Sequence, residues 1–245
     1  MTKKTYAVLF TAIAIFLWGF STGCKTGPDL SDLRQPTPAT VKTPVPEPEL
    51  SGVYTVSGRN ENSAKPYEGS LTVENREEAY RFNWQTNLDK YNGTGVQMND
   101  AVAVTYTDGL DGKDCGVVLY KIAADGSLDG RVVTNGEYTF GIETAVRMEG
   151  TSFDGKYSVS GKTNYGREYK GTIDIARNGS GYQATWGGGV PRVGFGMWRG
   201  DRAAIGFGGW QCSFVLFKVQ PGGDLEGRWG SQRTVAFGTE NAKKQ

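Results

Sequence analysis

Two glutamates at corresponding positions are the side chains in this sequence best suited to acid–base chemistry. Glu143 and Glu240 each stand in a Phe-Gly-x-Glu pattern, and paired carboxylates are the groups that hydrolyse glycosidic bonds. The 245 residues include no histidine, which excludes Ser-His and Cys-His nucleophile pairs and imidazole metal ligands. We therefore predict no catalysis. We expect the two glutamates to accept hydrogen bonds from backbone N–H groups at a barrel rim, or to pair with Arg131 and Arg228.

No other group of acidic residues has the spacing of a metal site. Asp108, Asp111 and Asp114 are three apart in a Gly-rich turn, but they lack the length and the terminal Glu of an EF-hand calcium loop. The 27 basic and 26 acidic side chains nearly balance, whereas nucleic-acid binding needs a basic surface. The sequence thus predicts no metal, no cofactor and no nucleic-acid partner.

Two cysteines also occupy corresponding positions. Cys115 and Cys212 are 97 residues apart. A disulfide would need their Cα atoms within about 4.4–6.8 Å of each other. If each half of the chain closes on itself, equivalent interior cysteines cannot meet. We therefore expect two free, buried thiols that pack as small apolar side chains, with a disulfide as the alternative in an oxidising compartment.

Tryptophans provide the candidates for a binding surface, because an indole combines a large apolar area with a polar tip. Three of them occur only in the second half of the chain: Trp198, Trp210 and Trp229. The first half has other residues at the matching positions: Gln97, Lys113 and Val132. Arg199 and Arg228 lie beside two of these indoles and complete the predicted binding set. The alternative is that the three indoles fill the interior of the fold.

A tandem repeat must position all of these residues. Its two copies cover residues 51–149 and 150–245, and the offset between matching motifs drifts only from 103 to 97. The shared motifs include Gly-x-Tyr-x-Val-x-Gly, Tyr-x-Gly, Tyr-x-x-x-Trp, Gly-x-Gly, Cys-x-x-Val-Leu and Leu-x-Gly-Arg. A period of about 100 residues is much longer than that of a solenoid, so each copy is a domain or half-domain.

Each copy divides into about eight short strands. In the first copy we predict strands near 52–58, 68–74, 79–85, 93–98, 101–107, 115–122, 127–133 and 137–144. In the second copy we predict 155–161, 170–176, 181–187, 194–198, 202–207, 212–219, 224–229 and 234–240. Asn-Gly and Asp-Gly pairs between these runs supply the positive φ of tight hairpins. The pattern predicts an all-β protein of two tandem antiparallel meanders, each forming a small barrel. One joint barrel or sandwich is the alternative.

Charge separates the two copies. Residues 51–149 hold 9 basic and 15 acidic side chains, and residues 150–245 hold 13 basic and 7 acidic ones. Three readings remain open: docking of the copies through complementary faces, attraction of the second copy to an acidic partner, and neutral drift on solvated surfaces.

The N-terminus has the features of an export signal. Lys3 and Lys4 precede an apolar run of about 15 residues that ends at Phe20, shorter than the roughly 20 residues of a membrane span. The small residues before Cys24 resemble the lipobox of bacterial lipoproteins, although Ser21 replaces the usual Leu. The resemblance implies a signal peptide over residues 1–23, acylation of Cys24 and stable anchoring by two or three chains such as palmitate.

A Pro-rich tether is predicted to follow, over residues 24–50. Six of the nine prolines lie in this segment, and such composition favours an extended spacer outside any core. Lys25 follows Cys24, in place of the Asp that retains lipoproteins in the inner membrane of enteric bacteria. We therefore expect a cell-envelope protein, anchored in the outer membrane of a Gram-negative-type bacterium.

The repeat motifs resemble a group of bacterial exported β-repeat proteins, often labelled fibronectin-binding by similarity. The resemblance covers about residues 51–242 and implies a lipid-anchored, adhesin-like protein with an extracellular protein or glycan ligand. It assigns no binding residue. The alternative is an envelope structural protein, or a carrier with an apolar ligand in its barrel cavities.

Overall fold

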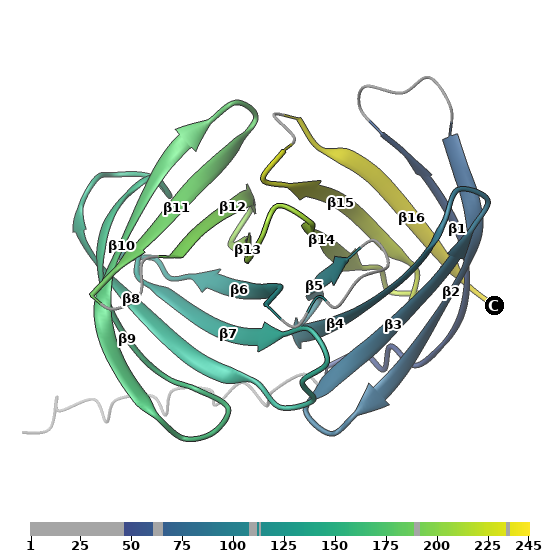
Figure 1. Cartoon of the computed structure of the whole chain (residues 1–245), viewed down its shortest axis with the longest axis horizontal. Helices are drawn as coiled ribbons and strands as arrows, with labels where there is room; N and C mark the ends of the chain where they lie inside the picture. The colour runs from purple at the N-terminus through teal and green to yellow at the C-terminus, as the bar shows by residue number, and fades with distance from the viewer. Residues whose placement is uncertain (1–46, 61–65, 108–111, 113, 189–191, 234–235) are drawn as a thin grey trace, which may run out of the picture. The chain divides into compact units, whose positions relative to one another are not determined.

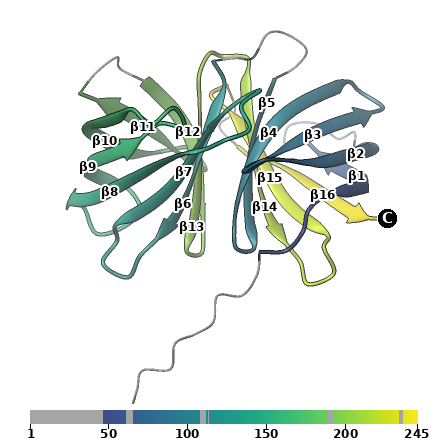
Figure 2. The same ribbon diagram turned by 90° about the horizontal axis from the view of Figure 1, so that it is seen from below.

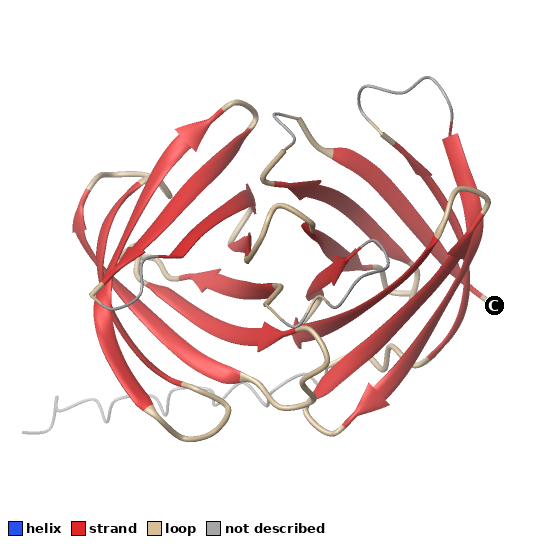
Figure 3. Ribbon diagram, viewed as in Figure 1, coloured by secondary structure: helices blue, strands red, loops and turns tan. Residues whose placement is uncertain are grey.

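The computed structural model describes residues 47–60, 66–107, 112, 114–188, 192–233 and 236–245. The predicted signal peptide, Cys24, Asp108 and Asp111 lie outside the described residues. Pro44–Gln245 forms one compact unit, and its described residues hold sixteen strands and no helix (Figure 3). Within the part described, there is accordingly no helix with the length and hydrophobicity to cross a membrane. The all-β prediction is confirmed.

The strands form two closed antiparallel barrels of eight strands each (Figure 1). The inserted barrel uses one continuous stretch of chain: β6 (Gly116–Ile122), β7 (Leu128–Thr134), β8 (Gly141–Glu149), β9 (Gly155–Lys162), β10 (Glu168–Asn178), β11 (Gly181–Gly187), β12 (Arg192–Arg199) and β13 (Arg202–Phe207). The split barrel combines both ends of the folded chain: β1 (Gly52–Arg59), β2 (Pro66–Arg76), β3 (Ala79–Thr86), β4 (Lys90–Met98), β5 (Ala101–Thr107), β14 (Cys212–Val219), β15 (Leu225–Ser231) and β16 (Gly238–Lys244).

The barrels do not coincide with the repeats, because the two copies exchange their last three strands. β5 pairs with β14, with Val104 opposite Val215, and β13 pairs with β6, with Ile205 opposite Val118. Each barrel therefore contains one strand for every position of the repeat, five from one copy and three from the other. The expectation that each copy closes on itself is wrong. β6 and β14 hold equivalent positions in the two copies and share the sequence Val-Leu followed by an aromatic residue and Lys.

Two strands begin later than the sequence suggests. β8 begins at Gly141 and β16 at Gly238, about four residues after the predicted starts. In the first case, the predicted turn forms at Gly136, which has φ +85°, but the residues after it up to Phe140 are not in a strand.

Alternation along each strand places one set of side chains inside its barrel. Val56, Leu71, Phe82 and Phe217 belong to the core of the split barrel. Leu50 is fully buried there, and Tyr54 donates its hydroxyl to the Leu50 carbonyl at 2.6 Å.

The inserted barrel repeats this arrangement at one of its ends. Phe153 is buried in the matching place, and Tyr157 donates its hydroxyl to the Phe153 carbonyl at 2.8 Å. Phe153 also meets the ring of Tyr182 edge-on at 5.0 Å. A large side chain before the first strand of each copy thus closes that end of each barrel.

A third apolar layer lies where the two barrels meet (Figure 2). It is made by the outward faces of the strands at which the barrels meet. Two of these strands, β5 and β13, are therefore buried on both sides. Its larger side chains include Leu119, Phe195, Met197, Phe214 and Leu216. Small residues such as Ala103 and Ala204 stand between them. The shared layer explains why these strands are apolar on both faces.

A disulfide joins Cys115 and Cys212, so the expectation of two free thiols is wrong. Their Cα atoms are 5.3 Å apart, within the range that the bond requires. Cys115 stands immediately before β6 and Cys212 begins β14, so the bond joins the two points at which the chain changes barrel. Gly208 has φ +122°, and a Cβ there would lie 2.6 Å from the Cys212 Sγ atom. Only glycine suits this crossing.

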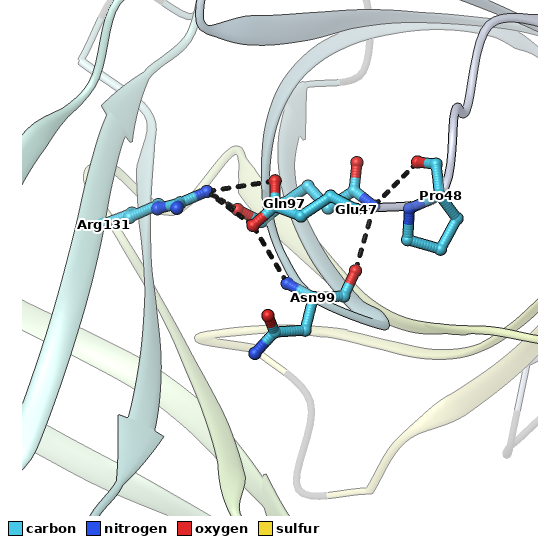
Figure 4. Close-up of polar contacts among 5 residues, drawn as sticks. All are labelled: Glu47, Pro48, Gln97, Asn99 and Arg131. Atoms are coloured by element: carbon cyan, nitrogen blue, oxygen red, sulfur yellow. Dashed lines mark hydrogen bonds and ion pairs between the residues drawn. The ribbon is translucent and has the colours of Figure 1, made fainter. Parts of the chain in front are cut away.

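The end of the predicted tether belongs to the folded part (Figure 4). Glu47 pairs with Arg131 at 3.2 Å and accepts from the Asn99 N–H at 3.1 Å. The side-chain amide of Gln97 donates a hydrogen bond to the Pro48 carbonyl at 2.9 Å. The backbone carbonyl of Gln97 accepts a hydrogen bond from Arg131. The tether predicted for residues 24–50 therefore excludes residues 47–50. Their polar groups and the buried Leu50 are part of the unit.

Strand exchange also redistributes charge. The stretch 116–207 carries 11 basic and 9 acidic side chains, while 47–107 and 212–245 together carry 10 basic and 12 acidic ones. The contrast between copies therefore shrinks to a small difference between barrels. Docking of an acidic copy onto a basic copy does not describe this molecule, since the copies are not separate bodies.

Candidate functional site

A cavity of about 610 Å³ opens at one end of the inserted barrel. All eight strands contribute to its lining, one residue each in this selection: Val118, Val132, Glu143, Val159, Tyr169, Trp186, Arg192 and Phe207. The lining comes from the starts of β8, β10 and β12 and the ends of β7, β9 and β11. Those positions share one end of an antiparallel barrel. The other end is the one closed by Phe153.

The carboxylate of Glu143 lies in the wall of this cavity with three donors around it. Tyr120 donates its hydroxyl to Oε1, Tyr169 donates to Oε2 at 2.9 Å, and Trp186 donates its indole N–H to Oε1 at 3.4 Å. Glu143 is only 4% exposed. Buried carboxylates require such donors. The predicted partner Arg131 instead pairs with Glu47.

The tyrosines that hold Glu143 stay protonated over the ordinary pH range. Burial is the first cause that raises the pKa of Tyr120 and of Tyr169, and the nearby Glu143 is the second. Neutral phenols remain hydrogen-bond donors. This part of the wall is therefore a fixed polar cluster. An apolar part of the lining is formed by Val118, Val132, Val159 and Phe207.

Cations surround the mouth of the cavity. Lys162 ends β9, Arg167 precedes β10, Lys170 lies in β10 and Arg192 begins β12; all four are exposed and line the opening. The Arg192 guanidinium lies 4.2 Å from the centre of the Phe207 ring, a cation–π contact. Among the described residues, none of the four cations has a carboxylate within 4.0 Å. Glu168 is the one acidic residue of the rim in this lining.

The split barrel has the same cluster but a much smaller cavity, of about 180 Å³. Tyr67 donates its hydroxyl to Glu240 at 2.7 Å and Trp84 its indole N–H at 2.8 Å. Phe217 stands where the inserted barrel has Tyr120, so one donor is absent there. Burial raises the pKa of Glu240, and the two hydrogen bonds oppose the rise.

Larger side chains account for the difference in volume. Trp229, Tyr91 and Tyr106 line the split barrel at the places where the inserted barrel has Val132, Arg192 and Phe207. The lining of the smaller cavity contains no Lys or Arg among the described residues. Cavity and positive mouth are thus both features of the inserted barrel.

The residues predicted to form a binding set do not come together. Trp229 lies inside the split barrel, and its buried indole N–H has no hydrogen-bond partner among the described residues. Trp198 is 43% exposed at the closed end of the inserted barrel, where its ring lies 6.2 Å from Phe153. Beside it, Arg199 pairs with Glu226 at 2.7 Å.

The remaining two predicted residues are also apart. Trp210 is 68% exposed between β13 and β14, with the Arg233 guanidinium 3.8 Å from its ring centre. Arg228 is exposed on β15 and has no contact with Glu240.

Glu143 and Glu240 belong to different barrels, so they cannot flank one glycosidic bond as a carboxylate pair. Within the part of the chain that the structure covers, no three His, Cys, Asp or Glu residues are grouped to hold a metal ion.

Sequence reasoning singled out Glu143 and Glu240 but treated the Tyr and Trp residues around them only as core residues or repeat motifs. Tyr67 and Tyr169, Trp84 and Trp186, and Glu240 and Glu143 all match between copies. The sequence feature that could have revealed this cluster is that the residues shared by the two copies include polar side chains. A purely apolar interior would not need them. The cations of the mouth left no such signal, since Arg192 corresponds to Tyr91 and Lys170 to Glu68.

The chain matches none of the family models, curated proteins or solved structures with which it was compared.

Proposed function

We propose that this chain is a lipid-anchored protein of the cell envelope that binds a small, largely apolar ligand in the inserted barrel. The observation that supports binding is the cavity of about 610 Å³ lined by all eight strands. Its volume falls among small-ligand sites, which span roughly 300–1,000 Å³. Val118, Val132 and Trp186 supply apolar walls, while the Glu143 cluster adds a few oriented polar groups. Catalysis is not part of this proposal.

Anchoring rests on the sequence alone. The apolar run that ends at Phe20 and the small residues before Cys24 support export and acylation. The experiment is to compare the full chain with its Cys24→Ser variant by membrane fractionation and mass spectrometry. The proposal requires a diacylglycerol-sized mass on the wild type only. If the wild type carries no lipid, the anchor must be abandoned.

Ligand binding is tested with the full chain and a panel of lipids, haem and vitamins. A compound that binds the folded state alone raises the melting temperature by mass action. The control variant is Val132→Trp, which copies into the inserted barrel the residue that occupies the split barrel. A true cavity ligand should stabilise the wild type and lose its effect on Val132→Trp. No saturable effect with any compound would contradict the proposal.

A second candidate is an adhesin-like protein that binds an extracellular protein or glycan. The exposed pair of Trp210 and Arg233 favours it, because Trp and Arg are the residues most enriched at binding hot spots. Solid-phase binding to matrix proteins and glycans would test this candidate. A Trp210→Ala variant should lose the signal, whereas Val132→Trp should keep it.

A further inference from the structure

We propose that the ligand of the inserted barrel is an anionic amphiphile, with an acyl-like apolar part inside the cavity and a carboxylate or phosphate group at its mouth. This inference rests on the proposed function and specifies the chemistry of its ligand. It is carried by the placement of cations and apolar walls around one opening.

The mouth supplies the positive charge. Lys162, Arg167, Lys170 and Arg192 come from the β9–β10 hairpin and from β12, and they line a single opening. Glu168 is the acidic residue of the rim in this lining, and Glu137 accepts a hydrogen bond from Asn164 of the same lining. Like charges gathered without partners raise the local concentration of anions and orient them on entry. Guanidinium groups also pair with carboxylate and phosphate in two parallel hydrogen bonds.

Arg192 is the cation best placed to serve both parts of such a ligand. It shares the inward-facing parity of Gly194 on β12, and its guanidinium lies against Phe207. Phe207 in turn meets Trp186 edge-on at 6.0 Å. A molecule that passes Arg192 therefore contacts aromatic rings directly beneath a positive charge.

The inner polar cluster excludes the reverse orientation. Tyr120, Tyr169 and Trp186 all direct their donors at Glu143. An acid group inserted head-first would meet a carboxylate and find no free donor in this cluster. Burying an unpaired charge is costly, so the anionic group belongs at the mouth.

The split barrel provides an internal comparison. Tyr91 stands at the position of Arg192, and Glu68 at that of Lys170. Trp229 occupies space that Val132 leaves open. Loss of the cavity and loss of these cations coincide in the same barrel, as expected if the two features of the inserted barrel serve one ligand.

The experiment measures binding of four probes with the same alkyl chain to the full-length protein: dodecanoate, dodecyl phosphate, dodecanol and dodecyltrimethylammonium. Each is titrated below its micelle concentration and followed by tryptophan fluorescence and calorimetry. We expect both anions to bind about tenfold or more tightly than the alcohol, as one or two charge-assisted hydrogen bonds allow. Added salt should weaken only the anions.

Arg192→Gln and Lys162→Gln are the test variants, and each has a matched control at the closed end of the barrel. Arg177 also lies over a ring, 5.0 Å from the centre of Tyr182, and Lys156 is the second residue of the strand that Lys162 ends. The double test variant should bind the anions about tenfold more weakly and the alcohol as before. Arg177→Gln and Lys156→Gln should change neither.

The outcomes separate the two proposals. If dodecanol binds as tightly as the anions and Val132→Trp abolishes both, the cavity binds ligands but the anionic preference is overturned. A preference for dodecyltrimethylammonium overturns it as well. If the test variants weaken anion binding no more than their controls, the mouth is not the site of the acid group. If no probe binds, while haem or a vitamin does, the proposed function stands without this ligand class.

Discussion

Val132 and Trp229 occupy the same position in the two barrels, and the indole fills in one the space that remains open in the other. Gly238 accommodates that indole: a Cβ on it would lie 2.3 Å from the ring of Trp229. The inserted barrel has Gly141 at the matching place. Its cavity thus already has the glycine that a tryptophan would need.

Exchanging these two residues should enlarge the cavity of the split barrel and reduce that of the inserted barrel. We expect Trp229→Val to lower the free energy of unfolding by about 2–4 kcal/mol, because a large, partly buried aromatic group that packs on the core is removed. Val132→Trp should change it by about 1 kcal/mol or less, since the indole enters existing space. Urea unfolding of both variants provides the measurement. Equal losses in both would show that the inserted barrel has no room for the indole.

Tyr120→Phe reproduces in the inserted barrel the residue found in the split barrel, where Phe217 stands. Glu143 would keep Tyr169 and Trp186 and lose one buried donor. We expect a loss of about 1–2 kcal/mol in unfolding free energy. The matched control is Tyr165→Phe, which also removes a hydroxyl bonded to a glutamate, Glu137, but at a residue 80% exposed. The idea fails if both variants are equally stable.

Glu240 should make the protein less stable as the pH rises. Its pKa in the folded protein is raised above the ordinary value near 4.5, mainly by burial. The folded state therefore binds more protons than the unfolded state between the two pKa values. The stabilisation that comes from protonated Glu240 is fully present at a pH below the pKa of the unfolded state. It is lost as the pH rises through the pKa of the folded state.

The measurement is unfolding free energy against pH for the wild type and Glu240→Gln. We expect the variant to lose the downward slope that begins near pH 4.5. It should also be less stable by about 1–2 kcal/mol at low pH, since one amide oxygen cannot serve both Tyr67 and Trp84. Glu226→Gln is the control of opposite sign, because hydrogen bonding to Arg199 lowers the pKa of Glu226. An unaltered slope in Glu240→Gln would exclude this carboxylate as its source.

The strands could be predicted from the sequence, because local signals define them. Gly126, Gly136, Gly179 and Gly223 lie in predicted turns, and each has positive φ. Strand pairing could not be predicted in full. Val117 to Tyr120 and Phe214 to Phe217 have the same apolar pattern. The sequence therefore does not specify which of β6 and β14 pairs with β5 and which pairs with β13. The error about the cysteines followed directly, since a barrel made from one copy keeps them apart.

Part of the candidate site was also not predicted from the sequence. Trp229 was taken with other copy-specific indoles as a binding residue, yet its position in the repeat places it inside a barrel opposite Val132. The pattern of β15 already carried that information, because Leu225, Gly227 and Trp229 alternate inward. Arg192 could not be found this way, since its role depends on Phe207, which only strand pairing places beside it.

The disulfide should contribute about 2–4 kcal/mol to the free energy of unfolding, because it links cysteines that are 97 positions apart. Replacing both Cys115 and Cys212 by Ser should lower the unfolding free energy by that amount. A reductant should have the same effect on the wild type. Cys24→Ser is the control and should leave stability unchanged. If the reduced wild type unfolds at the same urea concentration as the oxidised form, the bond does not stabilise the fold.

Strand exchange sets the order in which the barrels can be completed during synthesis of the chain. A chain that emerges from its N-terminus supplies every strand of the inserted barrel by residue 207, whereas the split barrel must wait for β16, which ends at Lys244. Until then β1 and β5 have unpaired edges, the kind of surface on which chains aggregate. The part of the folded chain that is synthesised first is therefore the last to close, and a truncation near the C-terminus would leave its first five strands open.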